Sequence, residues 1–188
     1  MSEYHEIRLS GFGGQGIMLA GAILAEAAGI YDNKNVTQTR SYGPESRGGA
    51  SRSEIIISDE LIGYPEATKP DLVLAMTQEA ADKYHKDINT NGIMIIDSST
   101  VKNIPKASVK IFKIPITEIA VDIVGKKITS NVVALGSIAA IVNWVSKESI
   151  KKVVLLRSPK GTKKINEKAF EAGFKSALSL YSDIKNNQ

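Results

Sequence analysis

The sequence predicts a three-layer α/β fold built on a mostly parallel, mixed sheet. A glycine-rich turn stands between a short apolar strand and a helix-forming run in residues 5–29, which is typical of such folds. Residues 70–97 then alternate strand, polar helix and strand, with the near-continuous apolar runs of buried parallel strands. With 188 residues, 43% of them hydrophobic, the chain is long enough to form one domain over residues 1–188 with its own core.

The elements follow in order from periodicity and from Gly, Pro and Ser punctuation. The first strand is expected at residues 5–10, and the helix after it extends to about residue 29. Further elements are strands at 33–39, 50–58, 70–76, 92–97 and 108–116, and helices at 77–88, 130–145, 147–156 and 162–184. A parallel crossover needs about a dozen residues or more, and residues 39–50 have no helical pattern. The second and third strands are therefore expected to pair antiparallel or to lie apart in the sheet.

The composition excludes several classes of site. Cysteine is absent, and His5 and His85 are the only histidines. Disulfides, thiolate nucleophiles, cysteine-bound zinc and cysteine-ligated iron–sulfur clusters are therefore excluded on this chain. The longest apolar stretch, residues 131–145, is too short and too polar to span a membrane, and the first residues do not resemble a signal peptide. We expect a cytoplasmic protein with no membrane partner.

Charge is unevenly distributed along the chain. Residues 1–100 carry 8 Lys and Arg against 14 Asp and Glu, a net of −6, whereas residues 101–188 carry 16 against 6, a net of +10. A basic half can indicate a nucleic-acid partner. Here the lysines are scattered through helical patterns without interleaved aromatic residues, which favours a solvated or partner-facing helical surface over nucleic acid.

The glycine-rich turn has the spacing of a phosphate-binding loop. In "RLSGFGGQGIMLAG", residues 8–21, Gly11, Gly13 and Gly16 fit the pattern G-x-G-x-x-G, and Gly14 adds more open backbone. In this pattern the first glycine permits the tight turn, the second a close backbone approach and the third close packing of helix on strand. The helix N-terminus would offer unpaired N–H groups to an anion. A tight turn without a ligand is an equally good interpretation of the spacing.

The loop alone does not indicate which molecule would carry the bound phosphate. A dinucleotide site needs an acidic residue at the end of the second strand, where Thr39 and Arg40 stand instead. Asp32 precedes that strand and Glu45 lies well past it. No Gly-Lys-Ser/Thr follows the loop, so the Walker-type interpretation has no better support.

A second group of polar residues occupies "TRSYGPESRGGASRS", residues 39–53. It is either a surface loop with turn residues or an anion- or partner-binding loop at the carboxyl end of the second strand, beside the glycine-rich turn. Its guanidinium groups would suit a phosphate or a carboxylate. They belong to Arg40, Arg47 and Arg52.

Catalytic patterns are scarce elsewhere in the chain. Asp97, Ser98 and Ser99 end a strand, but helix capping explains them as well as catalysis does. There is no Ser-His-Asp spacing, no nucleophile elbow and no carboxylate pair in a shared motif. The chain does not look like a self-sufficient enzyme.

Three stretches in this order resemble the gamma subunit of 2-oxoacid:ferredoxin oxidoreductases. They are "GFGGQGIMLAGAILAEAA", "SYGPESRGGASRSEIIIS" and "YPEATKPDLVLAMTQEAADKY", and the resemblance covers most of the chain. The wording "SYGPESRGG" is more similar to the 2-oxoglutarate and branched-chain members than to the pyruvate type. The glycine loop and the Arg-Gly-Gly element of the family match Gly11, Gly13, Gly14, Gln15 and Gly16, and Arg47, Gly48 and Gly49.

The resemblance implies a Rossmann-like gamma domain in a complex that oxidatively decarboxylates a 2-oxoacid with coenzyme A. The products would be an acyl-CoA, CO2 and reduced ferredoxin, with 2-oxoglutarate the expected substrate. Thiamine diphosphate would lie between the alpha and beta subunits and the iron–sulfur clusters on companion chains, including a ferredoxin-like delta subunit. This chain would carry no cofactor of its own and would be inactive in isolation.

The resemblance also suggests which residues form a ligand-binding or subunit-contact loop. The alternatives to a non-catalytic or co-catalytic enzyme subunit are a free-standing NAD(P)-binding module and a purely structural assembly subunit. The expected loop residues are Gly11, Gly13, Gly14, Gln15, Gly16, Arg40, Ser41, Tyr42, Gly43, Arg47, Gly48 and Gly49.

Overall fold

A computed structural model describes residues 3–42, 51–106 and 108–186. Its strands are β1 (Tyr4–Gly11), β2 (Asn35–Ser41), β3 (Ser51–Ser58), β4 (Leu72–Ala75), β5 (Ile93–Asp97) and β6 (Lys110–Ile114). They form one six-stranded sheet in the order β2-β3-β1-β4-β5-β6. Strand β3 pairs antiparallel with both β1 and β2, and the remaining pairs are parallel. The expected mixed sheet, with the second and third strands antiparallel, is confirmed.

The helices are α1 (Ile17–Glu26), α2 (Gln78–Tyr84), α3 (Ile116–Glu118), α4 (Ser130–Ile141), α5 (Lys147–Leu156) and α6 (Lys163–Asn186). Two π-helical turns, η1 (Ala27–Tyr31) and η2 (Ile119–Ile123), and one 3₁₀ turn, η3 (Lys127–Thr129), complete them. The turns within residues 117–129 were not expected from the sequence, because short turns of this kind have no amphipathic period to detect. Helices α2 and α4 end earlier than the sequence predicts.

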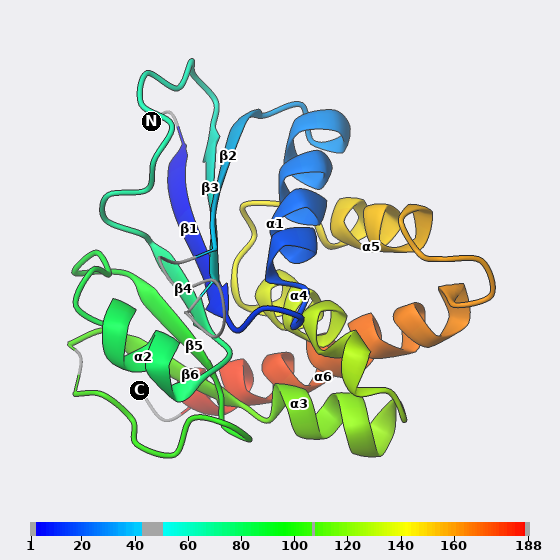
Figure 1. Ribbon diagram of the computed structural model, residues 1–188. Helices are drawn as coiled ribbons and strands as arrows, with labels where there is room; N and C mark the ends of the chain where they lie inside the picture. Colours follow the sequence, from blue (N-terminus) through cyan, green and yellow to red (C-terminus); the bar gives the residue numbers. More distant parts are fainter. Residues whose placement is uncertain (1–2, 43–50, 107, 187–188) are drawn as a thin grey trace.

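The helical layers on the two sides of the sheet are unequal (Figure 1). Helices α1, α4, α5 and α6 cover one face and enclose the larger core, which includes Leu9, Leu74 and Phe112. On the other face α2 covers β4 and β5, around Val73 and Met94. The fold therefore has three layers, as expected, but most of the core lies on the α1 side.

On the face of the sheet where α2 covers β4 and β5, strands β1 and β3 are covered by polar contacts and not by a helix. The guanidinium of Arg8 is buried there, donating from Nε to Glu54 Oε1 at 2.7 Å and from Nη2 to the Ala67 carbonyl at 3.1 Å. Its Nη1 pairs with Asp87, and the group lies 5.0 Å from the ring centroid of Tyr84. A buried charge is tolerated only when it is paired in this way.

The apolar stretch that was expected to be a buried helix is α4. Its residues from Ser130 to Ile138 are all buried between α1, α5 and α6. Within the described residues, no helix combines the length and the apolar character needed to cross a membrane.

Candidate functional site

The glycine-rich loop, residues 11–16, lies where the chain changes direction across the sheet. From β1 the chain first builds β2 and β3 on one side and later β4, β5 and β6 on the other. The carboxyl ends of the five strands that run in the same direction meet at the edge where this loop stands, and ligands of open α/β sheets bind at such a switch point. The Met76 N–H donates to the Ser10 carbonyl at 2.9 Å, which closes the sheet directly beneath the loop.

Gln15 holds the loop in shape. Its side-chain oxygen accepts a hydrogen bond from the Phe12 backbone N–H at 2.7 Å, and the backbone N–H of Gln15 donates to the Phe12 carbonyl at 3.2 Å. Its side-chain nitrogen lies 3.4 Å from the carbonyl of Met76, just past β4. The Gln15 side chain therefore stabilises the turn and ties it to the neighbouring strand.

The third glycine of the loop packs against a different element from the one expected. Gly14 and Gly16 have φ angles of 88° and 74°, in the left-handed region that favours glycine. A Cβ on Gly16 would lie 2.5 Å from Nδ2 of Asn131, so the third glycine packs closely against α4 rather than against a strand. The close helix–strand contact occurs instead at Gly21, where a Cβ would meet Ser53 of β3. Gly13, expected to allow a close approach, has no positive φ, and a Cβ there would meet no described atom within 4 Å.

The structure brings both ends of the second polar segment to this edge. Ser41 is paired in register with Arg52, and Ser51 with Gly11. The Ser51 hydroxyl also donates to the Gly11 carbonyl at 2.9 Å. Tyr42 is 69% exposed, so its ring is available to a partner. The remaining expected residues of this loop, Gly43, Arg47, Gly48 and Gly49, lie outside the described residues.

The two described arginines of this segment lie on opposite faces of the sheet. Arg40 is exposed and donates to Gln38 Oε1 at 2.9 Å, on the face covered by α1. Arg52 points to the other face, where its Nε lies 3.7 Å from Glu54 and makes no hydrogen bond. The two guanidinium groups therefore do not converge on one ligand.

Asp97 has a structural role. Its carboxylate is fully buried and accepts hydrogen bonds from the N–H and the hydroxyl of Thr117, at 3.2 and 2.5 Å, and from the Ser99 N–H at 3.0 Å. The Ser99 hydroxyl in turn accepts from the Glu118 N–H at 3.1 Å. Of the two interpretations left open by the sequence, this geometry favours capping over catalysis.

Asp32, the acidic residue closest in sequence to the start of β2, is held by hydrogen bonds to α5 and is not available to a dinucleotide. Asp32 accepts hydrogen bonds from the N–H and the hydroxyl of Ser146 and from the Ser149 hydroxyl, which fastens the turn before β2 to the start of α5. Thr39 and Arg40 stand at the end of β2 as the sequence indicated. The acidic residue typical of an NAD site is therefore missing from β2.

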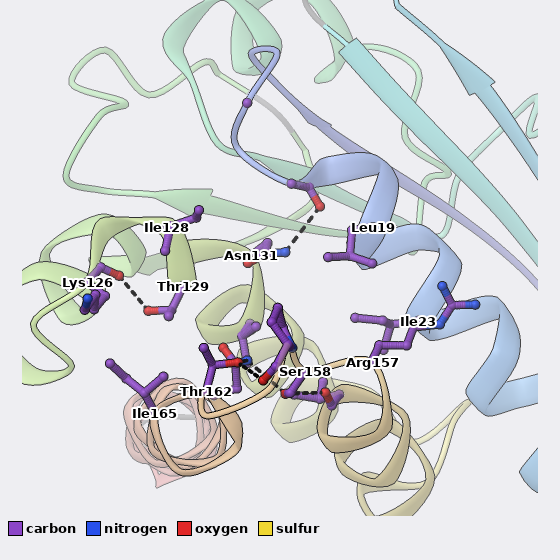
Figure 2. Close-up of a pocket in the computed structure, with 16 residues that line it drawn as sticks. Leu19, Ile23, Lys126, Ile128, Thr129, Asn131, Arg157, Ser158, Thr162 and Ile165 are labelled. Carbon is purple, nitrogen blue, oxygen red and sulfur yellow. Dashed lines mark hydrogen bonds between the residues drawn. The ribbon is translucent and has the colours of Figure 1, made fainter.

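Two neighbouring cavities open beside the loop and share Gly14 and Ile128. The first, which we call the edge pocket, has a volume of about 260 Å³ and is lined by Gly14, Gln15, Thr117, Lys127, Ile128 and Ser130. The second, which we call the helical socket, has about 400 Å³ and runs along α1 (Figure 2). Its walls come from α1, from η3 and the start of α4, and from the turn between α5 and α6; they include Leu19, Ile23, Ile128, Asn131, Arg157 and Ile165. The sequence did not indicate most of these residues as site residues, because they come from segments far apart in the chain.

Metal-binding chemistry has no obvious location in the part of the chain that the structure describes. The sequence contains no cysteine. Among residues 3–42, 51–106 and 108–186 there is no group of three or more His, Asp and Glu side chains placed to hold a metal ion.

Comparison with known proteins shows which family has this sequence and fold. The family model of pyruvate ferredoxin/flavodoxin oxidoreductases matches residues 6–176. The chain belongs to this family. It is 49% identical over 177 residues to 2-oxoglutarate synthase subunit KorC of Methanocaldococcus jannaschii, covering 93% of this chain and 95% of that one. The resemblance seen in the sequence is thereby confirmed.

Two further relatives show how this family uses the fold. The crystal structure of a keto/oxoacid ferredoxin oxidoreductase gamma subunit from Geobacter sulfurreducens superimposes with a TM-score of 0.88 at 46% identity, covering 94% of this chain and 98% of that one. Ketoisovalerate oxidoreductase subunit VorA of Methanothermobacter marburgensis is 32% identical over 91% of this chain, yet the matched part is only 36% of VorA. In VorA the corresponding unit is therefore one part of a longer polypeptide.

Proposed function

We propose that this chain is the gamma subunit of a cytoplasmic 2-oxoglutarate:ferredoxin oxidoreductase, with residues 1–188 forming one gamma-type domain. Its partners are the alpha, beta and ferredoxin-like delta subunits, and ferredoxin accepts the electrons. The complex oxidatively decarboxylates 2-oxoglutarate with coenzyme A, giving the acyl-CoA, CO2 and reduced ferredoxin. The observation that carries this proposal is the 49% identity to a 2-oxoglutarate synthase subunit over nearly the full length of both chains.

The redox cofactors of this enzyme belong to its other subunits. Thiamine diphosphate and the iron–sulfur clusters would supply the decarboxylation and electron-transfer chemistry there. The absence of cysteine supports this division, since this chain has no thiolate with which to ligate a cluster. The part of this chain is to bind and position, not to transfer electrons.

The edge pocket suits a phosphate of coenzyme A. The first turn of α1 has no side-chain cap, so this helix presents backbone N–H groups close to Gly14, which lines both cavities. Lys127 adds a positive charge to the same pocket. We propose that the loop of Gly11, Gly13, Gly14, Gln15 and Gly16 approaches coenzyme A here in the assembled enzyme. The second segment, Arg40, Ser41, Tyr42, Gly43, Arg47, Gly48 and Gly49, would contact a partner subunit or the same ligand.

Substrate preference of the purified complex tests the proposal. Reduction of ferredoxin should depend on coenzyme A and be faster with 2-oxoglutarate than with pyruvate or 2-ketoisovalerate. The isolated chain should be colourless and inactive. A complex that prefers another oxoacid would contradict the assignment, and NAD(P)H binding by the isolated chain would favour the free-standing nucleotide-binding module.

Substitution of Arg47 separates ligand binding from assembly. An arginine makes charge-assisted hydrogen bonds that contribute roughly 1.5–3 kcal/mol each, about ten- to a hundredfold in an equilibrium constant. If Arg47 contacts a partner subunit, as we expect, Arg47→Ala weakens subunit retention by this factor and leaves the KM for coenzyme A unchanged. If it contacts coenzyme A, the KM rises and assembly is normal. If the variant is normal in both measurements, the segment is an ordinary surface loop with neither role.

A further inference from the structure

The helical socket is lined by polar side chains that already form hydrogen bonds within the chain, mostly to backbone carbonyls (Figure 2). The Thr129 hydroxyl donates to the Lys126 carbonyl, and the Thr162 hydroxyl to the Pro159 carbonyl, each at 2.8 Å. The Ser158 hydroxyl donates to the Val154 carbonyl and accepts from Asn166, likewise at 2.8 Å. These hydroxyls and amides have little left to offer a polar ligand, and sites that recognise polar small molecules need convergent free donors. The interior of the socket therefore favours an apolar group.

Apolar side chains also stand exposed at the mouth of the socket. Ile128 is 80% exposed and Leu19 is 43% exposed, and both line the cavity. Figure 2 shows them on facing walls, one from η3 and the other from α1. Single exposed apolar residues are common, but a pair beside an apolar cavity of about 400 Å³ is typical of a surface that receives a partner.

The charge around this mouth is positive. Lys126 and Lys127 directly precede Ile128, and neither forms an ion pair with any carboxylate among the described residues. The other cation of the lining, Arg157, is held by Glu26, with both contacts at 2.5 Å. A partner that carries carboxylates beside its apolar side chains would complement this arrangement.

We propose that the socket receives the apolar side chains of an acidic, amphipathic segment from another subunit of the oxidoreductase. This rests on the proposed function, which makes the chain one subunit of several. The apolar side chains enter between Leu19 and Ile128, and the carboxylates of the segment meet Lys126 and Lys127. A helix that uses positions i and i+4 as anchors is a common way to fill such a groove.

Two observations favour another subunit over a second copy of this chain. Residues 101–188, which form most of the socket, carry a net charge of +10, so two copies meeting through this face would repel each other. In addition, VorA contains the corresponding unit inside a longer polypeptide. A separate gamma chain lacks that covalent link and needs a non-covalent contact in its place.

Assembly of the complex tests the docking surface. The tagged chain is co-expressed with the other subunits and carries Ile128→Glu or Leu19→Glu, either of which sets a carboxylate against the acidic segment. Recovery of the other subunits should fall at least tenfold. The matched control is Leu61→Glu, because Leu61 is 92% exposed but lies in the loop between β3 and β4 at the opposite edge of the sheet. The control should retain every subunit.

Both test substitutions should leave the chain folded. Ile128 is largely exposed, and Leu19 is the third residue of α1, where glutamate is favoured by the helix dipole. Thermal unfolding of the isolated variants verifies this. The double variant Lys126→Glu/Lys127→Glu should also weaken assembly, and added salt should weaken assembly of the unsubstituted complex.

The remaining outcomes overturn the proposal in distinguishable ways. Full assembly with Ile128→Glu and Leu19→Glu shows that the socket is not a docking site. If Leu19→Glu, which changes a residue of the socket but not of the edge pocket, leaves assembly intact and raises the KM for coenzyme A, the socket binds a small molecule. A dimer of the isolated chain that Ile128→Glu dissociates would make a second copy the occupant. Failure of the proposed function is separate, since it appears as a fully assembled, unsubstituted complex that prefers a substrate other than 2-oxoglutarate.

Discussion

The two edges of the sheet are built in contrasting ways. At the edge where β1 and β4 begin, carboxylates fasten one loop to the next. Asp71 accepts hydrogen bonds from the Glu6 N–H at 3.0 Å and from Asn89 at 2.9 Å. Asp59 accepts from Lys34 and from the Glu3 N–H, and these bonds hold the pKa of Asp59 below its ordinary value. The acidic groups at this edge are used to hold the fold together.

The carboxyl edge has cavities, exposed apolar side chains and cations instead. Left-handed glycines shape its loop, and Lys126, Lys127 and Ile128 are exposed beside the two pockets. Side chains bonded to neighbours within the chain stabilise it, whereas exposed, unpaired groups beside a cavity are free for another molecule. The first edge therefore serves stability alone, whereas the carboxyl edge also offers groups for recognition.

The largest expected effect follows from adding a methyl group at Gly16. Gly16→Ala places a side chain at a left-handed φ and 2.5 Å from Nδ2 of Asn131, and should cost about 2–4 kcal/mol of folding free energy. The matched control Gly13→Ala should change it by less than about 0.5 kcal/mol, because no described atom lies within 4 Å. Urea unfolding of the isolated chains measures both.

A second substitution sharpens this result. Asn131→Ala in the Gly16→Ala background removes the two shortest contacts, those with Nδ2 and Cγ of Asn131, and should recover part of the lost stability, leaving at least the backbone cost of about 1–2 kcal/mol. Equal stability of Gly16→Ala and Gly13→Ala would contradict the close packing of the loop against α4.

An intermediate effect is expected at the opposite edge. Asp32→Ala removes the acceptor for Ser146 and Ser149 and should cost about 1.5–3 kcal/mol of folding free energy. Asp32→Asn, which keeps one acceptor oxygen, should cost less. Once the complex is assembled, its kcat and its KM for coenzyme A should be unchanged. A change in either constant would show that this edge also takes part in recognition.

The smallest expected effect concerns His5, which stacks on Trp144 with ring centroids 4.2 Å apart. Burial lowers the pKa of His5 below its ordinary value of 6.5, although Asp71 and Glu3 act to raise it. The unfolded chain therefore binds the proton more readily, so the stability contributed by neutral His5 is complete above pH 6.5 and is lost as the pH falls through the folded pKa.

Unfolding followed through the fluorescence of Trp144, the only tryptophan, should reveal this step as the pH falls below 6.5. His5→Phe retains a stacked ring and should remove the step. If the step is of the same size in the variant, another group is responsible for it.

Local pattern was sufficient for the strands, for most of the helices and for part of the site. The alternation and apolar runs of the strands predicted a mixed sheet, and the short link between the second and third strands left two arrangements, antiparallel pairing or separate places, of which the structure shows the first. Glycine spacing placed the loop at Gly11 to Gly16 before α1, because turn chemistry is local. The Arg-Gly-Gly element remains a prediction, since Arg47, Gly48 and Gly49 lie outside the described residues.

Contacts between distant segments decided the rest. The sequence contains Asn131 and Gly16 far apart, and only the packing of α4 on the loop shows that the third glycine makes room for an amide side chain. In the same way, the position of Asp32 before the second strand argued against a ribose ligand, but only the fold shows that Asp32 bonds to Ser146 and Ser149. Periodicity and turn residues determine helices, strands and loops because those depend on near neighbours. Which side chains remain unpaired beside a cavity depends on three-dimensional packing, and this packing produced the helical socket.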